Sequence, residues 1–73
     1  MQLSNLKAGM RAKIEKILEK KEIKIKLASL GIGIDTIIMM VKNDFIGAII
    51  LAIKDNRIII DRDLAKKIDV KVL

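Results

Sequence analysis

The chain has 73 residues, of which 52% are hydrophobic and 33% are charged, and its formal net charge is +6. This length suits one small domain over residues 1–73, and the hydrophobic share is typical of a chain that folds around a core. The chain contains neither cysteine nor histidine. Disulfides, zinc fingers, iron–sulfur clusters and histidine acid–base chemistry are therefore excluded, and we expect a protein that is not an enzyme.

The hydrophobic segments are too short to cross a membrane as helices. The longest uncharged apolar run covers residues 45–53, whereas a spanning helix needs about 20 residues. The start of the chain also lacks the basic and then apolar pattern of a secretory signal. These features predict a cytoplasmic protein.

Basic residues are concentrated in the first part of the chain. Residues 1–30 hold eight basic and three acidic side chains, whereas residues 31–73 hold seven and six. Such a surface suits nucleic acid, an anionic membrane or an acidic partner, and it equally suits a lysine-rich surface that only meets solvent. Phe45 is the only aromatic residue, which disfavours nucleic acid because single strands usually stack on aromatic side chains.

Short strands dominate the first expected elements. Ala12 and Ile14 alternate with polar residues, as in a half-buried strand. Residues 36–41 and 48–53 are aliphatic runs of strand length, and turn-forming residues 43–47 separate them.

The segment between the first and second expected strands, residues 22–30, fits both a strand and a helix. Its first apolar residues alternate, yet Ile23, Leu27 and Leu30 also follow the i, i+4, i+7 spacing of a helix. Gly31 is suited to end a helix because it adopts positive φ without strain. We predict a helix with Leu30 at an interior position.

The last third of the chain predicts a hairpin, a short helix and a final strand. Asp55 and Asn56 both tolerate positive φ and predict a tight turn before a strand over residues 57–60. Asp61 is suited to cap a helix of one or two turns, and residues 68–72 alternate like a strand. Five strands and one or two short helices in a chain this small predict a mainly β, partly open barrel.

Several short motifs follow one another along nearly the whole chain. They are Leu3-x-x-Leu6-x-x-Gly9, Lys26-Leu27-x-x-Leu30-Gly31, Ile58-Ile59-Ile60 and Leu64-Ala65-Lys66-Lys67-Ile68-x-Val70. Their order and spacing resemble the ferrous-iron transport protein A (FeoA) family of small SH3-like barrels. The chain departs from the family where Ile34-Asp35 replaces a common proline–glycine turn and where Asp55 replaces a frequent glycine. Aspartate can adopt the left-handed conformation, so we expect the first turn to survive.

The resemblance implies a non-enzymatic, cytoplasmic accessory module of ferrous iron transport. The implied partner is the cytosolic side of a FeoB-type ferrous-iron permease, which carries a GTPase domain. A related barrel forms the C-terminal domain of iron-dependent repressors, but no DNA-binding helical domain precedes the barrel here, so we expect a free-standing module.

The family's association with a transition metal ion is likewise only an implication. Ferrous iron favours imidazole together with carboxylate, and this chain has no histidine. Asp61 and Asp63 are better explained as the start of a helix, where acidic side chains favour the helix dipole. We therefore expect no metal site and no cofactor.

One pair of strands is apolar on both faces. A small barrel buries only one face of its sheet, so one set of these side chains must point outward. We predict an exposed apolar patch made of Ile37, Met39, Ile50 and Ala52, at positions that are often polar in the family. Such a patch usually marks an interface, here with a second copy of the chain or with the permease. The alternative is that the helix over residues 23–30 covers this face.

Five lysines make up the main positive cluster: Lys16, Lys20, Lys21, Lys24 and Lys26. Beside a permease they would face anionic lipid, which implies peripheral membrane proximity, and the alternative is a solvated surface without a partner. Two further functions stay open as alternatives. One is a small basic β-barrel that binds nucleic acid, and the other is a structural module that assembles into a homo-oligomer.

Overall fold

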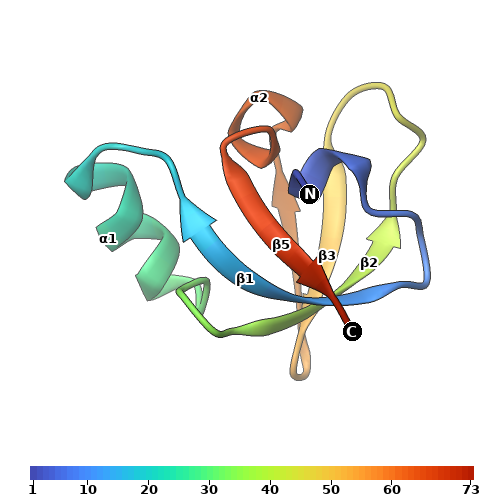
Figure 1. Ribbon diagram of the computed structural model, residues 1–73, viewed down its shortest axis with the longest axis horizontal. Helices are drawn as coiled ribbons and strands as arrows, with labels where there is room; N and C mark the ends of the chain where they lie inside the picture. The colour runs from blue at the N-terminus through green and yellow to red at the C-terminus, as the bar shows by residue number, and fades with distance from the viewer.

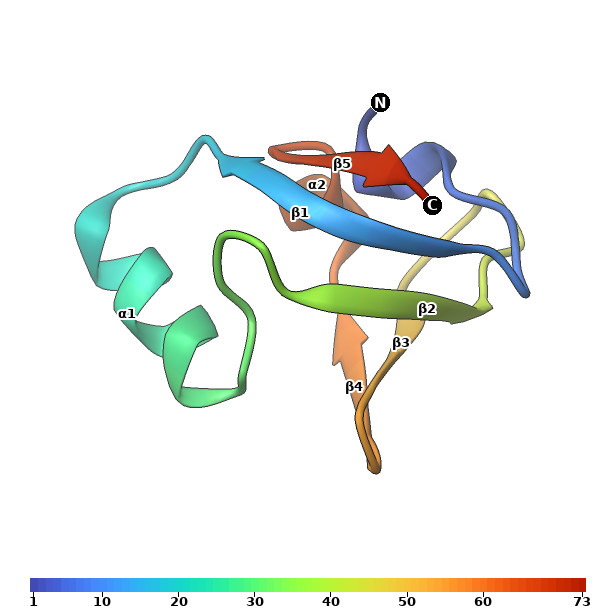
Figure 2. The same ribbon diagram turned by 60° about the horizontal axis from the view of Figure 1, so that its bottom comes forward.

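The computed structural model describes all residues, 1–73, and is built around one antiparallel sheet (Figure 1). Its strands are β1 (Arg11–Ile17), β2 (Ile37–Lys42), β3 (Ile49–Ile53), β4 (Asn56–Ile60) and β5 (Ile68–Val72). Three short helices accompany them: η1 (Leu3–Asn5), α1 (Lys21–Ser29) and α2 (Arg62–Ala65). The strand order is β4-β3-β2-β1-β5, and the sheet curls without closing fully (Figure 2). The predicted mainly β, partly open SH3-like barrel is confirmed.

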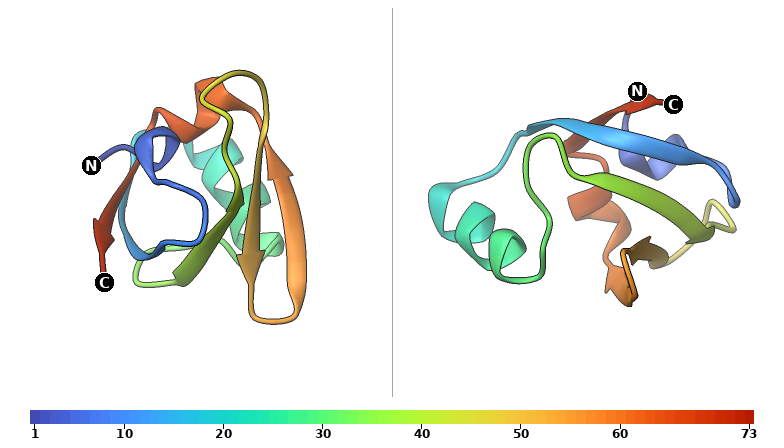
Figure 3. Two further views of the ribbon diagram at one scale, coloured as in Figure 1. Left: turned by 90° about the vertical axis from the view of Figure 1, so that its right-hand side faces the viewer. Right: turned by 90° about the horizontal axis from the view of Figure 1, so that it is seen from below.

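The two edges of the sheet differ. At the β5 edge, Gln2 bridges to Asp69, and the Val70 amide donates a 2.8 Å hydrogen bond to the Met1 carbonyl. Both ends of the chain lie on this side of the molecule (Figure 3). At the opposite edge, β4 pairs with β3 on one side and has no strand on the other. The N-terminus therefore covers one edge and leaves the other open.

Sixteen buried hydrophobic residues form a single core. The inner faces of β2 and β3 contribute Ile38, Met40 and Leu51, each at most 1% exposed. Leu3 from η1 and Leu27 from α1 join the same cluster, which attaches both segments to the sheet. Because neighbouring residues of a strand point to opposite faces, the burial of this set directs the next residues outward.

Helix α1 ends as the sequence predicts, but with a different anchor. Gly31 has a φ of +89°, its amide donates to the Ala28 carbonyl, and the Ile32 amide donates to the Leu27 carbonyl at 2.8 Å. These two bonds form a Schellman motif, in which the residue after the glycine packs back against the last turn. Ile32 is accordingly fully buried, and the prediction that Leu30 is interior is wrong, since Leu30 is 51% exposed.

The connections around β4 differ slightly from the prediction. Ile53 pairs with Asn56, so the hairpin loop consists of Lys54 and Asp55, and Lys54 alone has positive φ. The turn therefore lies one residue earlier than predicted, because inward placement of Ile53 determines the register. Asp61 occupies the N-cap position of α2 but makes no side-chain capping bond.

The turn residue Asp35, in the loop between α1 and β2, behaves as expected. Asp35, which stands where the family commonly has glycine, adopts a φ of +69°. It precedes β2 and its amide donates a 2.7 Å bond to the Ile14 carbonyl. The left-handed turn is thus retained without glycine, and it brings β2 alongside β1.

A buried asparagine connects three segments that lie far apart in the sequence. The Asn43 side chain, in a residue only 7% exposed, donates from Nδ2 to the carbonyls of Ser4 and Leu6, each at 2.9 Å. Its Oδ1 accepts the Phe45 amide at 2.9 Å and Nη2 of Arg62 at 2.8 Å. The amide group thus makes four hydrogen bonds, and we call this arrangement the Asn43 clamp.

Arg62 extends the Asn43 clamp to α2. Its Nε donates to the Gly47 carbonyl at 2.9 Å, and its Nη1 donates to the Ser4 carbonyl at 3.3 Å. One guanidinium therefore contacts the N-terminal segment, the β2–β3 loop and the side chain of Asn43. This replaces part of the hydrophobic packing that such a small domain lacks.

The clamp predicts a large loss of stability on replacement of Asn43. In Asn43→Ala, two backbone carbonyls, the Phe45 amide and one guanidinium hydrogen lose their partner, so we expect the free energy of unfolding to fall by about 3 kcal/mol. Urea denaturation followed by circular dichroism measures this change. Asn5→Ala, at an exposed position without side-chain hydrogen bonds, is the matched control and should change stability by less than about 0.5 kcal/mol. Equal values for both variants would contradict the role of the clamp.

The two faces of β2 predict opposite effects for adjacent methionines. Met40→Lys places an unpaired charge in the core and should abolish cooperative folding, because its cost exceeds the stability of about 5 kcal/mol typical of such a domain. Met39→Lys, at a position 36% exposed, should keep a cooperative urea transition and lose no more than about 1 kcal/mol. Loss of folding in Met39→Lys would show that the outer face is part of the core.

Candidate docking surface on the outer sheet face

The four residues of the predicted apolar patch lie together on the outer face of β2 and β3. Ile37 and Met39 are 47% and 36% exposed, while Ile50 and Ala52 are half-buried. Met39 lies directly opposite Ala52. Helix α1 lies beyond one end of the sheet and does not cover this face (Figure 2). The alternative of a covering helix is therefore wrong.

The patch continues onto β4, beyond the four predicted residues. Ile59 is 73% exposed and pairs with Ile50 across the β3–β4 hairpin. Three consecutive isoleucines occupy positions 58–60, so no polar residue marks which of them points outward. Only the pairing register assigns Ile59 to the outer face.

Cations stand at both ends of an apolar row across this face. The cross-strand register aligns Arg11, Met39, Ala52 and Arg57 on β1, β2, β3 and β4. None of the four ion pairs of the molecule involves Arg11 or Arg57. The outer face therefore offers apolar contact area between two free guanidinium groups, each able to bind a carboxylate in two-pronged fashion.

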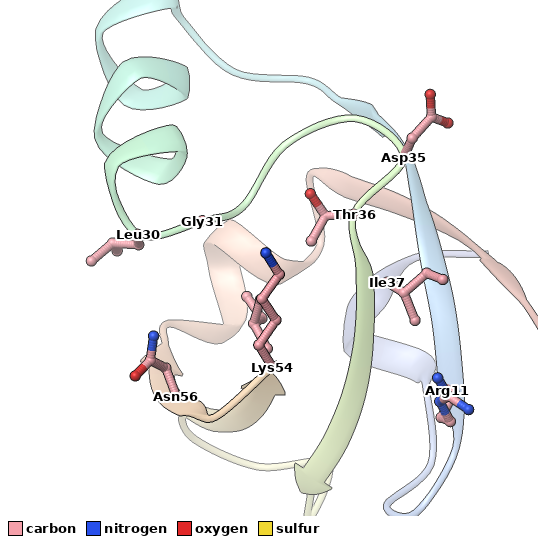
Figure 4. Close-up of a pocket in the computed structure, with 9 residues that line it drawn as sticks. Arg11, Leu30, Gly31, Asp35, Thr36, Ile37, Lys54 and Asn56 are labelled. Atoms are coloured by element: carbon pink, nitrogen blue, oxygen red, sulfur yellow. The ribbon is translucent and has the colours of Figure 1, made fainter.

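A groove runs beside the row, between the end of α1 and the β3–β4 hairpin (Figure 4). Its larger part has a volume of about 680 Å³, with Leu30 on the helix side, Thr36 and Ile37 at the start of β2, and Lys54 on the hairpin. A smaller hollow of about 220 Å³ reaches Met39. The two hollows share Arg11, Ile37 and Lys54, so they form one continuous depression lined by aliphatic residues, by the basic Arg11 and Lys54, and by the acidic Asp35.

The acidic residues do not gather into a metal site. Asp61 and Asp63 are both exposed, and Asp63 faces Lys66 at 4.0 Å. No group of three or more histidine, cysteine, aspartate or glutamate residues lies close enough to hold a metal ion. These scattered carboxylates do not match the combination of imidazole and carboxylate that ferrous iron prefers.

The five lysines of the basic surface lie around α1, at the end of the molecule from which this helix projects. All of them are exposed, and none takes part in an ion pair. No helix in the chain has the length and apolar character needed to cross a membrane. None of these lysines lines the groove beside the apolar row, so the basic surface and the groove are two separate features.

Comparison with solved structures finds close matches to the whole fold. A crystal structure of an iron uptake regulatory protein (FeoA) has a TM-score of 0.92 and 26% identity, covering 100% of this chain and 97% of its own. A FeoA protein from Chlorobium tepidum gives 0.90 and 24%, covering 100% and 70%. A manganese-dependent transcriptional repressor gives 0.85 and 24%, covering 100% of this chain but 41% of its own. The last two likenesses show the fold alone.

Comparison with curated proteins finds no match. The family model of the FeoA domain, by contrast, matches residues 1–72, which is nearly the entire chain. The matched residues include all five strands, all three helices and the residues of the Asn43 clamp. The chain therefore belongs to the FeoA family of small domains associated with ferrous iron transport.

Proposed function

We propose that this protein is a non-enzymatic accessory module that acts in the cytoplasm and regulates a FeoB-type ferrous-iron permease by docking onto its cytosolic side. Membership of the FeoA family supports the link to iron transport. The observation that carries the docking proposal is the apolar row of Met39 and Ala52 between the unpaired Arg11 and Arg57. A partner segment with apolar side chains flanked by carboxylates satisfies both features.

The charges of the outer face favour a different protein over a second copy. A symmetrical dimer through this face would bring the free guanidinium groups of Arg11 and Arg57 from both copies together. Like charges at the edge of a desolvated contact are costly, so this arrangement is disfavoured. An acidic partner gains from the same charges, through faster association as well as through ion pairs.

The groove offers contact area but no obvious chemistry. It contains neither histidine nor cysteine, since the chain has none. Its polar side chains come from arginine, lysine, aspartate, threonine and asparagine, and its apolar side chains are Leu30, Ile37 and Ile53. This composition suits recognition of a partner segment, and regulation would follow from the nucleotide state of the partner's GTPase domain.

The proposal predicts saturable binding to the permease. Purified protein titrated into detergent-solubilised FeoB-type permease from the same cell should bind with an affinity that changes with guanine nucleotide. Met39→Lys should weaken this binding about tenfold or more, because one central apolar contact is replaced by a charge. Ile46→Lys, at an isoleucine that is 82% exposed in the β2–β3 loop and outside the groove, is the matched control and should bind like the parent protein.

Two outcomes would contradict this function. The first is the absence of binding at concentrations of about tens of micromolar in every nucleotide state. The second is permease binding that Met39→Lys leaves unchanged although its urea transition shows that it is folded. The first outcome rejects the partner, and the second rejects the outer face as the contact surface.

A further inference from the structure

The surface around α1 combines unpaired cations with exposed aliphatic side chains. We define the α1 surface by Lys16, Leu18, Lys20, Lys24, Ile25 and Ile34. Leu18, Ile25 and Ile34 are each more than half exposed, and all three lysines are exposed. Helix α1 projects from one end of the sheet, which leaves this surface open to large partners (Figure 1).

The three lysines surround one open hollow. Lys16, Lys20 and Lys24 line it together with Leu18, Ile34 and the acidic Glu19, and its volume is about 640 Å³. Lys20 is the N-cap residue of α1 and Lys24 lies in its first turn, and both side chains line the hollow. The hollow therefore places three ammonium groups around a space with aliphatic walls.

The neighbouring acidic residues leave this positive charge largely uncompensated. Residues 16–26 contain five lysines and two glutamates. Glu19 is engaged with Lys67 at 3.7 Å, and Glu22 lies in the first turn of α1, where it favours the helix dipole. All four ion pairs of the molecule involve lysines other than those of the α1 surface.

We propose that the α1 surface binds an anionic lipid bilayer, with lipid phosphates held among Lys16, Lys20 and Lys24 and with Leu18, Ile25 and Ile34 inserted at the headgroup boundary. The complementarity is one of charge and of apolarity together. Lysines near an anionic membrane attract the protein, and exposed aliphatic side chains beside them gain by leaving water. This proposal does not depend on the permease or on the outer face.

The same surface suits nucleic acid poorly. Bases stack on aromatic side chains and on arginine, whereas the α1 surface contains aliphatic residues and lysines only. Phe45, the single aromatic residue, belongs to the β2–β3 loop and not to α1. Exposed isoleucine and leucine contribute nothing to phosphate binding on a nucleic acid, but they do contribute to partition into a membrane interface.

Sedimentation with lipid vesicles tests the proposal. The full chain should bind vesicles of phosphatidylcholine and phosphatidylglycerol in equal amounts, should not bind vesicles of phosphatidylcholine alone, and should bind more weakly as salt rises. Lys20→Gln combined with Lys24→Gln should weaken binding about tenfold or more, since each lysine near the surface is worth about fivefold. Leu18→Gln combined with Ile25→Gln should also weaken it several-fold while leaving the charge unchanged.

A matched double variant separates local from overall charge. Lys7→Gln combined with Lys71→Gln removes the same charge at exposed positions outside α1 and should keep vesicle binding within about twofold. The proposal is overturned by equal binding to both kinds of vesicle, by equal losses in the two lysine variants, or by binding only to a single-stranded oligonucleotide. The permease titration in detergent contains no bilayer, so its result and this one are independent.

Discussion

The burial of the inner faces of β2 and β3 in the core is the constraint on which the rest of the molecule depends. Ile38, Met40 and Leu51 are almost completely buried there, and a chain of 73 residues has no second layer to bury the other face of the sheet. The alternate residues of the two strands, such as Met39 and Ala52, therefore point outward although they are apolar. The candidate docking surface is a direct consequence of this one-sided core.

The Asn43 clamp supplies what such a small core cannot. Asn43 and Arg62 bring the N-terminal segment, the β2–β3 loop and α2 together through backbone carbonyls. Because the donors and acceptors lie up to 58 residues apart in the chain, no local pattern marks them. The sequence indicated only that residues 43–47 form a turn, and the polar residue that organises the turn became visible in the tertiary structure.

The molecule presents two surfaces of different chemistry at different places. The outer face carries an apolar row between Arg11 and Arg57, which matches a partner segment bearing carboxylates. The α1 surface interleaves lysines with aliphatic residues, which matches a lipid interface. The same fold also occurs in a manganese-dependent transcriptional repressor. Since a fold of this kind hosts several functions, the exposed residues rather than the barrel distinguish them.

Local chemistry sufficed for the features that depend on neighbouring residues. Alternation predicted the first and last strands, and aliphatic runs bounded by turn residues predicted the strands between them. Gly31 predicted the end of α1, and Asp35 was expected to take the left-handed conformation that it adopts. The Lys54 turn, the position of Arg57 beside the apolar row and the bonds of Asn43 depend instead on strand register and on contacts between distant segments. The sequence by itself therefore determined which elements form and which residues are apolar. Only the tertiary structure decided which of these residues share a face, because that depends on how the strands pair.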